Sequence, residues 1–385
     1  MPDVAGARKR VLRFVVLLGV VSLLADVTYE GARGIAGPYL GLLGASGAVV
    51  GFVGGFGELA GYGLRLVSGL LSDRTRKYWA ITFVGYAINL LAVPALAFAG
   101  RWEVAAGLLM LERVGKAIRT PPRDAMLSQA TAGVSAGWAF GLHEALDQIG
   151  ALTGPLLAAA VLAVRHSYAE SFLAMLVPAV GALVVLGAAW RLYPRPQDLA
   201  PAFSGVGPSG YSRQFWLYLA AVGLVAAGFV DFPLIAFHMQ RAGWAGEAAI
   251  PLYYALAMGV DAIAALVFGR LYDRWGIVSL IAAAGVSALV APLAFLAGPA
   301  GLAPAMVLWG VGMGAQESVM RAAVGRMVAS ERRGAAYGFF NACYGLMWFA
   351  GSAAMGLLYD RSLFVMVGLS ATLPLLAIPL LWRAR

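Results

Sequence analysis

Apolar residues are arranged along this chain in long runs that short polar segments separate. An α-helix needs about 20 apolar residues to cross the hydrocarbon core of a bilayer. Runs of this kind lie at residues 12–37, 47–71, 78–98, 103–125, 136–164, 171–191, 214–239, 248–270, 277–297, 302–327, 334–358 and 363–382. They lack the two-residue alternation of a transmembrane β-barrel. The pattern therefore predicts an all-α integral membrane protein with twelve transmembrane helices.

The composition supports this interpretation. Of the 385 residues, 61% are hydrophobic and 12% are charged, and the mean hydropathy is +0.80. The 49 glycines are compatible with helices in a bilayer, where small residues let neighbouring helices approach closely. The basic amino-terminal segment resembles the start of a signal peptide, but no small-x-small cleavage pattern follows it. We expect an uncleaved first helix.

Lysine and arginine gather in alternate connections between the runs. On one side they are Arg8, Lys9, Arg10, Arg13, Arg74, Arg76, Lys77, Arg191, Arg195, Arg213, Arg326, Arg332, Arg333, Arg383 and Arg385, and on the other only Arg101, Arg165, Arg241 and Arg361. Basic short loops stay on the cytoplasmic side. We therefore expect both termini to be cytoplasmic, in the plasma (inner) membrane of a bacterium or archaeon. The net charge of +9 mostly reflects this bias, so no nucleic-acid partner is expected.

A polar linker rich in Pro, Gly and Ser, Tyr193–Gln214, divides the runs into six and six. We predict a six-helix bundle at 1–192, a cytoplasmic linker at 193–213 and a second six-helix bundle at 214–385.

The two halves share short sequences. "GLLSDR" at Gly69–Arg74 recurs as "GRLYDR" at Gly269–Arg274. Asp26 and Arg33 are seven residues apart, as are Asp231 and His238 in the second half. The repeats predict two pseudo-symmetric bundles, an arrangement typical of secondary transporters.

Three motifs identify a family resemblance that covers the whole chain. Gly69, Asp73, Arg74 and Lys77 fit the signature G-x-x-x-D-R-x-x-R/K that follows helix 2 in the major facilitator superfamily, and Gly269, Asp273 and Arg274 repeat it. Gly150, Gly154 and Pro155 fit the helix-5 signature G-x-x-x-G-P, which is common in antiporters. Arg113 fits the helix-4 signature, although Lys116 and Ala117 stand where that family has Gln-Gly. The resemblance implies alternating access around a cavity lined by helices 1, 4, 7 and 10.

The distribution of charges over the runs is informative, because an ionisable side chain at bilayer depth costs roughly 3 kcal/mol or more unless it faces protein or water. The third, sixth, ninth and twelfth runs have uncharged interiors and are expected to face lipid. In the run 103–125, four charged residues lie on one helical face at i, i+4, i+7 and i+11: Glu112, Lys116, Arg119 and Arg123. They are expected to line a polar path that ends at the cytoplasmic mouth, where Pro121 and Pro122 stop the helix.

Two sets of candidate residues follow. The substrate or proton path is expected to contain Asp26, Glu30, Arg33, Glu58, Glu112, Arg113, Lys116, Arg119, Glu144, Asp147, Asp231, Asp261, Glu317 and Arg321. The cytoplasmic gate is expected to contain Gly69, Asp73, Arg74, Lys77, Gly269, Asp273 and Arg274.

Within the path, individual roles are expected. Either Asp26 or Glu58 would carry the coupling proton, and Glu112 would be the structural partner of Arg113. His143 would pair with Asp147. With three His and one Cys in the chain, no transition-metal site is expected. No cofactor is expected, and no nucleophile–base pair indicates an enzyme.

The sequence thus favours a monomeric secondary transporter whose partners are a small-molecule solute, protons and the lipid bilayer. The helix-5 signature favours proton antiport, that is, efflux of a small organic or amphipathic solute. One alternative is a proton symporter or facilitator for uptake of a small organic anion. Another is a membrane sensor or scaffold that has a transporter fold and transports nothing.

Overall fold

The computed structural model describes residues 4–131, 136–194, 211–328 and 333–384, and within these ranges all regular structure is helical. The first half contains α1 (Val4–Leu42), α2 (Gly47–Thr75), α3 (Tyr78–Ala95) with the short η1 (Leu96–Phe98), α4 (Trp102–Thr131), α5 (Ala136–Arg165), α6 (Tyr168–Ala174) and α7 (Leu176–Leu192). The second half contains α8 (Arg213–Gly228), α9 (Phe232–Arg241), α10 (Ala249–Trp275), α11 (Val278–Ser287), α12 (Val290–Leu296), η3 (Pro299–Gly301), α13 (Leu302–Met327), α14 (Arg333–Arg361) and α15 (Leu363–Arg383).

These elements account for the twelve predicted spans. Ten spans are long and apolar enough to cross a membrane within the described residues. The other two are α4 and α13, which have 30 and 26 residues. At 1.5 Å per residue these helices are about 45 and 39 Å long, enough to cross a bilayer. They fall outside the apolar set because polar residues are concentrated in them. The prediction of an all-α multi-pass membrane protein is confirmed.

Three predicted spans are broken helices. The run 171–191 is interrupted at Met175, the run 214–239 at residues 229–231, and the run 277–297 between α11 and α12. The second break has a clear cause, because the Asp231 carboxylate accepts a hydrogen bond from the backbone N–H of Phe232 and caps α9. Pro233 then occupies the first turn, where its missing N–H has no cost. The apolar runs continue through these breaks, so hydrophobicity alone does not reveal the interruptions.

The prediction that Pro121 and Pro122 end the fourth span is wrong. Both lie inside α4, which continues to Thr131. Proline at position 121 removes the N–H that would bond the carbonyl of Ala117. That carbonyl instead accepts a hydrogen bond of 3.0 Å from the hydroxyl of Ser68 on α2. A side chain from a neighbouring helix thus replaces the lost backbone bond, as is common in membrane helices.

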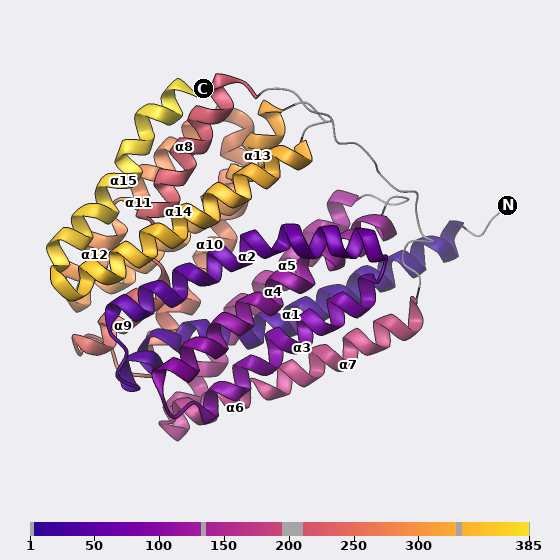
Figure 1. Cartoon of the computed structure of the whole chain (residues 1–385), viewed down its shortest axis with the longest axis horizontal. Coiled ribbons are helices and arrows are strands. Elements are labelled where there is room, and N and C mark those ends of the chain that lie inside the picture. Colours follow the sequence, from indigo (N-terminus) through magenta and orange to yellow (C-terminus); the bar gives the residue numbers. More distant parts are fainter. Residues whose placement is uncertain (1–3, 132–135, 195–210, 329–332, 385) are drawn as a thin grey trace.

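The helices form two bundles. In the first, α1 packs against α5 and α7, and α4 packs against α2 and α3. In the second, α10 packs against α13, and α15 against α8 and α11. The main contacts between the bundles join α2 to α14, α5 to α10 and α1 to α9. Figure 1 shows α1–α7 on one side and α8–α15 on the other.

The bundles meet closely at one end, which we call the closed end. It contains the α1–α2 turn, residues 43–46, and the α14–α15 turn at Ser362. The Asp360 carboxylate of α14 accepts hydrogen bonds from the backbone N–H groups of Gly47 and Ala48, at 3.0 and 2.8 Å, at the start of α2. A carboxylate at a helix amino terminus is favourable because that end has unpaired N–H groups and a partial positive charge. Toward the other end, where α1 begins and α15 ends, the ribbons of α2 and α14 diverge (Figure 1).

The shared spacing of Asp26–Arg33 and Asp231–His238 does not fit the positions of the helix ends. The loop motif repeats with an offset of 269 − 69 = 200, and the ends of α1 and α9, Leu42 and Arg241, differ by 241 − 42 = 199. Asp26 and Asp231 differ by 231 − 26 = 205. Asp231 contacts Arg33 and so lies about two helical turns further along α1 than Asp26.

A row of glycines makes the close approach of α2 and α14 possible. Gly47, Gly51 and Gly55 recur every four residues and face α14. A Cβ atom on Gly51 would overlap the backbone oxygen of Ser352 and lie 2.8 Å from the Cα of Gly356. Larger side chains at these positions would separate the helices.

We therefore expect Gly51→Val to hold the closed end apart. Spin labels would be placed at Leu42 and Phe364, which are 62% and 75% exposed, in a Cys343→Ser background. The distance between the labels, measured by pulsed electron paramagnetic resonance, should lengthen by several ångström. The control is Gly63→Val on the same helix, where a Cβ meets nothing within 4 Å. Equal distance distributions in the two variants would contradict the packing argument.

Candidate functional site

A pocket of about 470 Å³ lies between α1, α2, α4 and α9. Its lining residues are Tyr29, Ala32, Arg33, Ala36, Leu40, Val50, Val53, Gly54, Leu109, Glu112, Arg113, Asp231 and Pro233. Four of them belong to the predicted path. The pocket touches the first, fourth and seventh spans, as expected, and the second span in place of the tenth.

Arg33 joins the two bundles at the wall of this pocket. Its Nη2 lies 2.7 Å from Oδ1 of Asp231 in the second bundle and 3.5 Å from Oε1 of Glu58 in its own bundle. The side chains of Arg33 and Asp231 are only 10% and 5% exposed, so solvent screens their attraction weakly. Gly54 leaves room for this pair, because a Cβ there would lie 2.7 Å from Oδ2 of Asp231. We call the Arg33–Asp231 pair the latch.

Arg113 enters the pocket from α4. Its Nε lies 3.2 Å from Oε2 of Glu112, which is the pairing expected from the sequence. The Nδ2 of Asn89 donates to Oε1 of Glu112 at 2.6 Å. The stem of Arg113 packs on Gly57, where a Cβ would come within 2.8 Å of its Cγ. Asn89 was missed by the sequence analysis, although an isolated amide in the apolar run 78–98 is a detectable signal.

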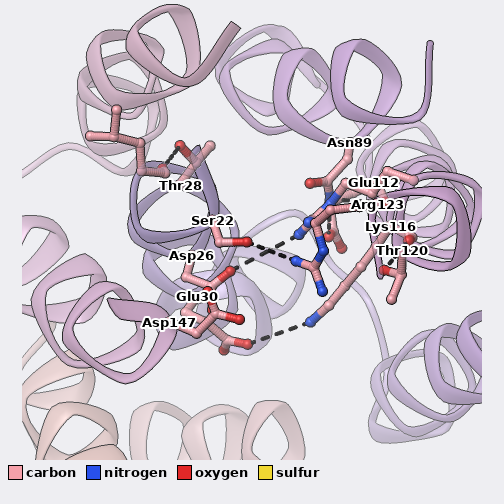
Figure 2. Close-up of polar contacts among 12 residues, drawn as sticks. Ser22, Asp26, Thr28, Glu30, Asn89, Glu112, Lys116, Thr120, Arg123 and Asp147 are labelled. Carbon is pink, nitrogen blue, oxygen red and sulfur yellow. Dashed lines mark hydrogen bonds and ion pairs between the residues drawn. The ribbon is translucent and has the colours of Figure 1, made fainter. Parts of the chain in front are cut away.

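Deeper in the first bundle, acids from α1 and α5 face bases from α4. Figure 2 shows the carboxyl groups of Asp26, Glu30 and Asp147 gathered together, with Lys116 and Arg123 extending toward them. Lys116 Nζ lies 4.0 Å from Oε1 of Glu30 and 3.9 Å from the centre of the Tyr29 ring, a cation–π distance. Buried charges need partners, and the acids of α1 and α5 supply them for the basic residues on the charged face of α4.

Glu30 also connects the bundles. Its Oε2 accepts a hydrogen bond of 2.5 Å from the hydroxyl of Tyr254 on α10. Both residues are buried. A carboxylate on α1 is thus shared between a lysine of its own bundle and a phenol of the other.

Arg119 is fully enclosed rather than placed at a cytoplasmic mouth. It is 1% exposed, and its guanidinium carbon lies 4.3 Å from the centre of the Tyr86 ring and 5.7 Å from that of Tyr29. Its nearest carboxylate is Asp26, at 4.0 Å. Two of its nitrogen atoms, Nε and Nη1, have no hydrogen-bond partner. The extension of α4 beyond Pro121 is what places this charge inside the bundle.

Arg123 organises a further group of polar side chains. Its Nη1 donates to the hydroxyl of Ser22 at 2.7 Å, and its Nε donates to Asp124 at 2.9 Å. His143 Nε2 lies 3.2 Å from the Ser22 hydroxyl and 3.7 Å from Oδ2 of Asp147, so the expected His143–Asp147 pair is present. The same imidazole nitrogen makes both contacts, which differs from the nucleophile–base–acid geometry of a hydrolase.

Other predicted path residues lie outside these groups. Asp261 is buried on α10, and its Oδ1 has no hydrogen-bond partner. Glu144 on α5 and Glu317 on α13 are exposed. The side chain of Arg321 lies outside the described part of the structure.

The family is decided by comparison with known proteins. The model of the Major Facilitator Superfamily matches residues 16–352. The chain belongs to the major facilitator superfamily. It is therefore a secondary transporter and not an enzyme.

Relatives of this superfamily member occur in several organisms. An uncharacterised protein from Mycobacterium tuberculosis is 42% identical over 380 residues, covering 97% of this chain and 93% of the relative, and the same values hold for one from Mycobacterium bovis. An uncharacterised MFS-type transporter from Methanocaldococcus jannaschii is 35% identical over 94 residues, which cover 24% of this chain and 23% of the relative.

Solved structures share the fold at low sequence identity. The nucleoside transporter NupG (D323A mutant) aligns with a TM-score of 0.77 at 12% identity, covering 95% of this chain and 99% of that one. The peptide transporter POT in complex with sulfate aligns with a TM-score of 0.77 at 15% identity, covering 97% and 93%. A bacterial homologue of the iron transporter ferroportin, in its inward-facing state, aligns with a TM-score of 0.72 at 15% identity, covering 97% and 98%.

The superfamily's helix-5 signature has a packing role in this structure. A Cβ on Gly150 would lie 2.8 Å from the Cβ of Asp26, and one on Gly154 would lie 2.7 Å from the backbone nitrogen of Gly31. Pro155 approaches Gly34 on the same face. The motif lets α5 lie directly against the charged face of α1.

The superfamily's gate signature lies at the end opposite the closed end. Asp273 pairs with Arg326 of its own bundle at 2.7 Å, and both side chains are more than half exposed. Arg74 and Lys77 are exposed. A Cβ on Gly69 would lie 3.5 Å from the Cβ of Pro121. A Cβ on Gly269 would meet nothing within 4 Å, and Arg274 lies near the ring of Trp275. The side chain of Asp73 lies outside the described part of the structure. A gating role for these residues stays a prediction.

Breaking the latch should favour opening of the closed end. Asp231→Asn removes the charge but keeps a good helix cap on α9. We expect this variant to shift the equilibrium toward the open form by roughly 1–3 kcal/mol, because a charge-assisted hydrogen bond between the bundles is lost. The spin-label distance between Leu42 and Phe364 measures this shift.

Two comparisons test the assignment. Arg33→Gln should act in the same direction, and the double variant should add little to either single change, since both remove one interaction. The control is Asp124→Asn, which breaks a pair within one bundle. Additive effects of Arg33→Gln and Asp231→Asn would show that the two residues act independently.

Proposed function

We propose that this transporter exports a small amphipathic solute in exchange for protons. The observation that carries the proposal is a group of carboxyl groups on α1 and α5 that faces the bases of α4 (Figure 2). Asp26 and Glu30 are buried and Asp147 is half-buried. Ionisable groups are expensive inside a membrane and mark proton and substrate paths. The helix-5 signature supports antiport over symport.

Within this group Asp26 is the best candidate for the proton carrier. It is 7% exposed, and its nearest base, Arg119, lies at the outer limit of an ion pair, 4.0 Å. Glu58, the other candidate, is held by Arg33 at 3.5 Å and is 19% exposed. A buried carboxyl group with a weak ion pair can exchange a proton more easily than one that is firmly paired. Figure 2 shows Asp147 beside Asp26, where it can share this role.

The proposal assigns sides to the two ends of the molecule. The basic connections favour cytoplasmic termini. On this assignment the closed end faces outward and the structure represents an inward-open state. Two of the solved structures that share the fold are described as inward-facing. Export would then begin with solute entering from the cytoplasm and end with opening of the latch and of the glycine contacts at the closed end.

The alternative within the same class is uptake of a small organic anion by proton symport. It is favoured by the two guanidinium groups of Arg33 and Arg113 at the pocket. A sensor or scaffold without transport would have no need for a cluster of buried charges on both faces of the α1–α4 contact.

The orientation can be tested directly. Single cysteines at Thr75, near the α2–α3 turn, and at Leu42, at the closed end, would be introduced into a Cys343→Ser background. In intact cells a membrane-impermeant maleimide should label the cysteine at Leu42 and not that at Thr75. Permeabilised cells supply the control, since both sites are exposed and should then react. Labelling of Thr75→Cys from outside would reverse the orientation.

Proton coupling can be tested in proteoliposomes that contain a pH-sensitive dye. We expect Asp26→Asn to abolish proton flux driven by a panel of amphipathic organic solutes, since the carrier can no longer bind and release a proton. Solute counterflow should persist, because exchange needs no net proton movement.

The matched variant is Glu58→Gln, which should retain solute-driven proton flux. Full proton flux in Asp26→Asn would move the carrier to another carboxyl group, with Asp147→Asn as the next variant to measure. Absence of solute-driven flux in the wild-type protein across the whole panel would instead argue for a sensor or scaffold.

A further inference from the structure

The carboxylates at the pocket are already occupied. Oε1 of Glu112 accepts from Asn89, and Oε2 pairs with Arg113. Oδ1 of Asp231 accepts both from Arg33 and from the backbone of Phe232. Each acidic residue that lines the pocket is therefore already paired with an arginine.

The guanidinium groups are not saturated. A guanidinium has five N–H donors. Arg113 uses Nε for Glu112, and its two terminal nitrogen atoms make no hydrogen bond or ion pair within the described part of the chain. Arg33 uses Nη2, while its Nε is buried without a partner. Unpaired guanidinium donors therefore remain at the pocket.

The rest of the pocket wall is apolar. Leu40, Val50, Val53 and Leu109 line it together with the ring of Pro233. Charged donors and an apolar wall in one pocket match a ligand with an anionic head and an apolar body.

We propose that this pocket binds an amphipathic organic anion, whose carboxylate, sulfonate or phosphate head bonds Arg113 and Arg33. Planar guanidinium groups bind such heads through two parallel hydrogen bonds. The inference rests on the proposed function, because it names the class of solute that the transporter would carry.

The position of Arg33 gives this binding a mechanical consequence. An anionic head that bonds Arg33 competes with Asp231, and the bond between these residues is the latch between the bundles. Glu58 lies 3.5 Å from the same guanidinium and can hold it once Asp231 has left. Solute binding therefore weakens the closed end, so that opening follows loading.

The binding test uses purified protein in detergent and four probes with the same apolar body: phenylbutyrate, phenylbutanesulfonate, phenylbutylamine and phenylbutanol. Isothermal titration calorimetry would measure their affinities. We expect the two anions to bind at least about tenfold more tightly than the amine and the alcohol, because only they can accept charge-assisted hydrogen bonds from the guanidinium groups.

Variants locate the site. Glu112→Gln with Arg113→Gln removes both charges of the pair, so no unpaired charge stays buried, and should weaken anion binding about 10- to 100-fold. The matched control is Arg101→Gln with Glu103→Gln, which removes a surface ion pair of 2.9 Å away from the pocket. Arg113→Lys, which keeps the charge but not the planar fork, should lie between wild type and the double variant. Thermal unfolding would confirm that each variant is folded.

A separate distance measurement tests whether the ligand opens the latch. Phenylbutyrate should lengthen the spin-label distance between Leu42 and Phe364, and phenylbutylamine should not. Equal affinities for all four probes, no binding by either anion, or wild-type affinity in the double glutamine variant would overturn the proposal. These measurements use no membrane and no gradient. Failure of proton coupling in proteoliposomes would therefore leave the anion site standing, and failure of anion binding would leave proton coupling to be judged on its own.

Discussion

The cost of burying charge is the constraint on which the first bundle depends. Its interior contains bases of α4 that are buried or half-buried, and each needs an acid or an aromatic ring nearby. Asp26 and Glu30 on α1 supply the carboxylates, and Tyr29 and Tyr86 supply ring faces for Lys116 and Arg119. The glycines of the helix-5 motif let α5 lie against α1 at this level. The same helix contacts therefore both pack the bundle and pair its charges.

The contacts between the bundles are of a different kind, because a transporter must be able to break them. At the closed end they include backbone approach at glycines, the ring contact between Phe52 of α2 and Phe349 of α14, the Asp360 cap on α2, and the latch. Each is specific in geometry but small in number of atoms. The approaches at Gly47, Gly51 and Gly55 involve no side chain of α2, so this part of the contact can separate without repacking of α2 side chains.

The two halves share a fold, but the buried ion pairs are distributed unequally between them. The ion pairs of the membrane interior that the described residues show, apart from the latch, lie in the first bundle. The second bundle contributes Asp231 and Tyr254, one to Arg33 and one to Glu30. Both are contacts of the second bundle to charged residues of α1. The first bundle thus contains these buried ion pairs, and the second bundle contacts them through residues of α1.

The sequence by itself determined the class of protein, its spans and the residue types of its buried charged groups. Apolar run length predicts a membrane helix, and i, i+4 spacing places Glu112 and Lys116, or His143 and Asp147, on one face. The His143–Asp147 pair follows from this i, i+4 spacing, and the Glu112–Arg113 pair joins residues that are adjacent in sequence. Tertiary structure alone decided the rest. The hydroxyl of Ser68 lets α4 continue through Pro121, and Asp231 meets Arg33 across 198 residues of sequence. Such partners are chosen by the packing of helices that are distant in the chain, and no periodicity within one helix contains that information.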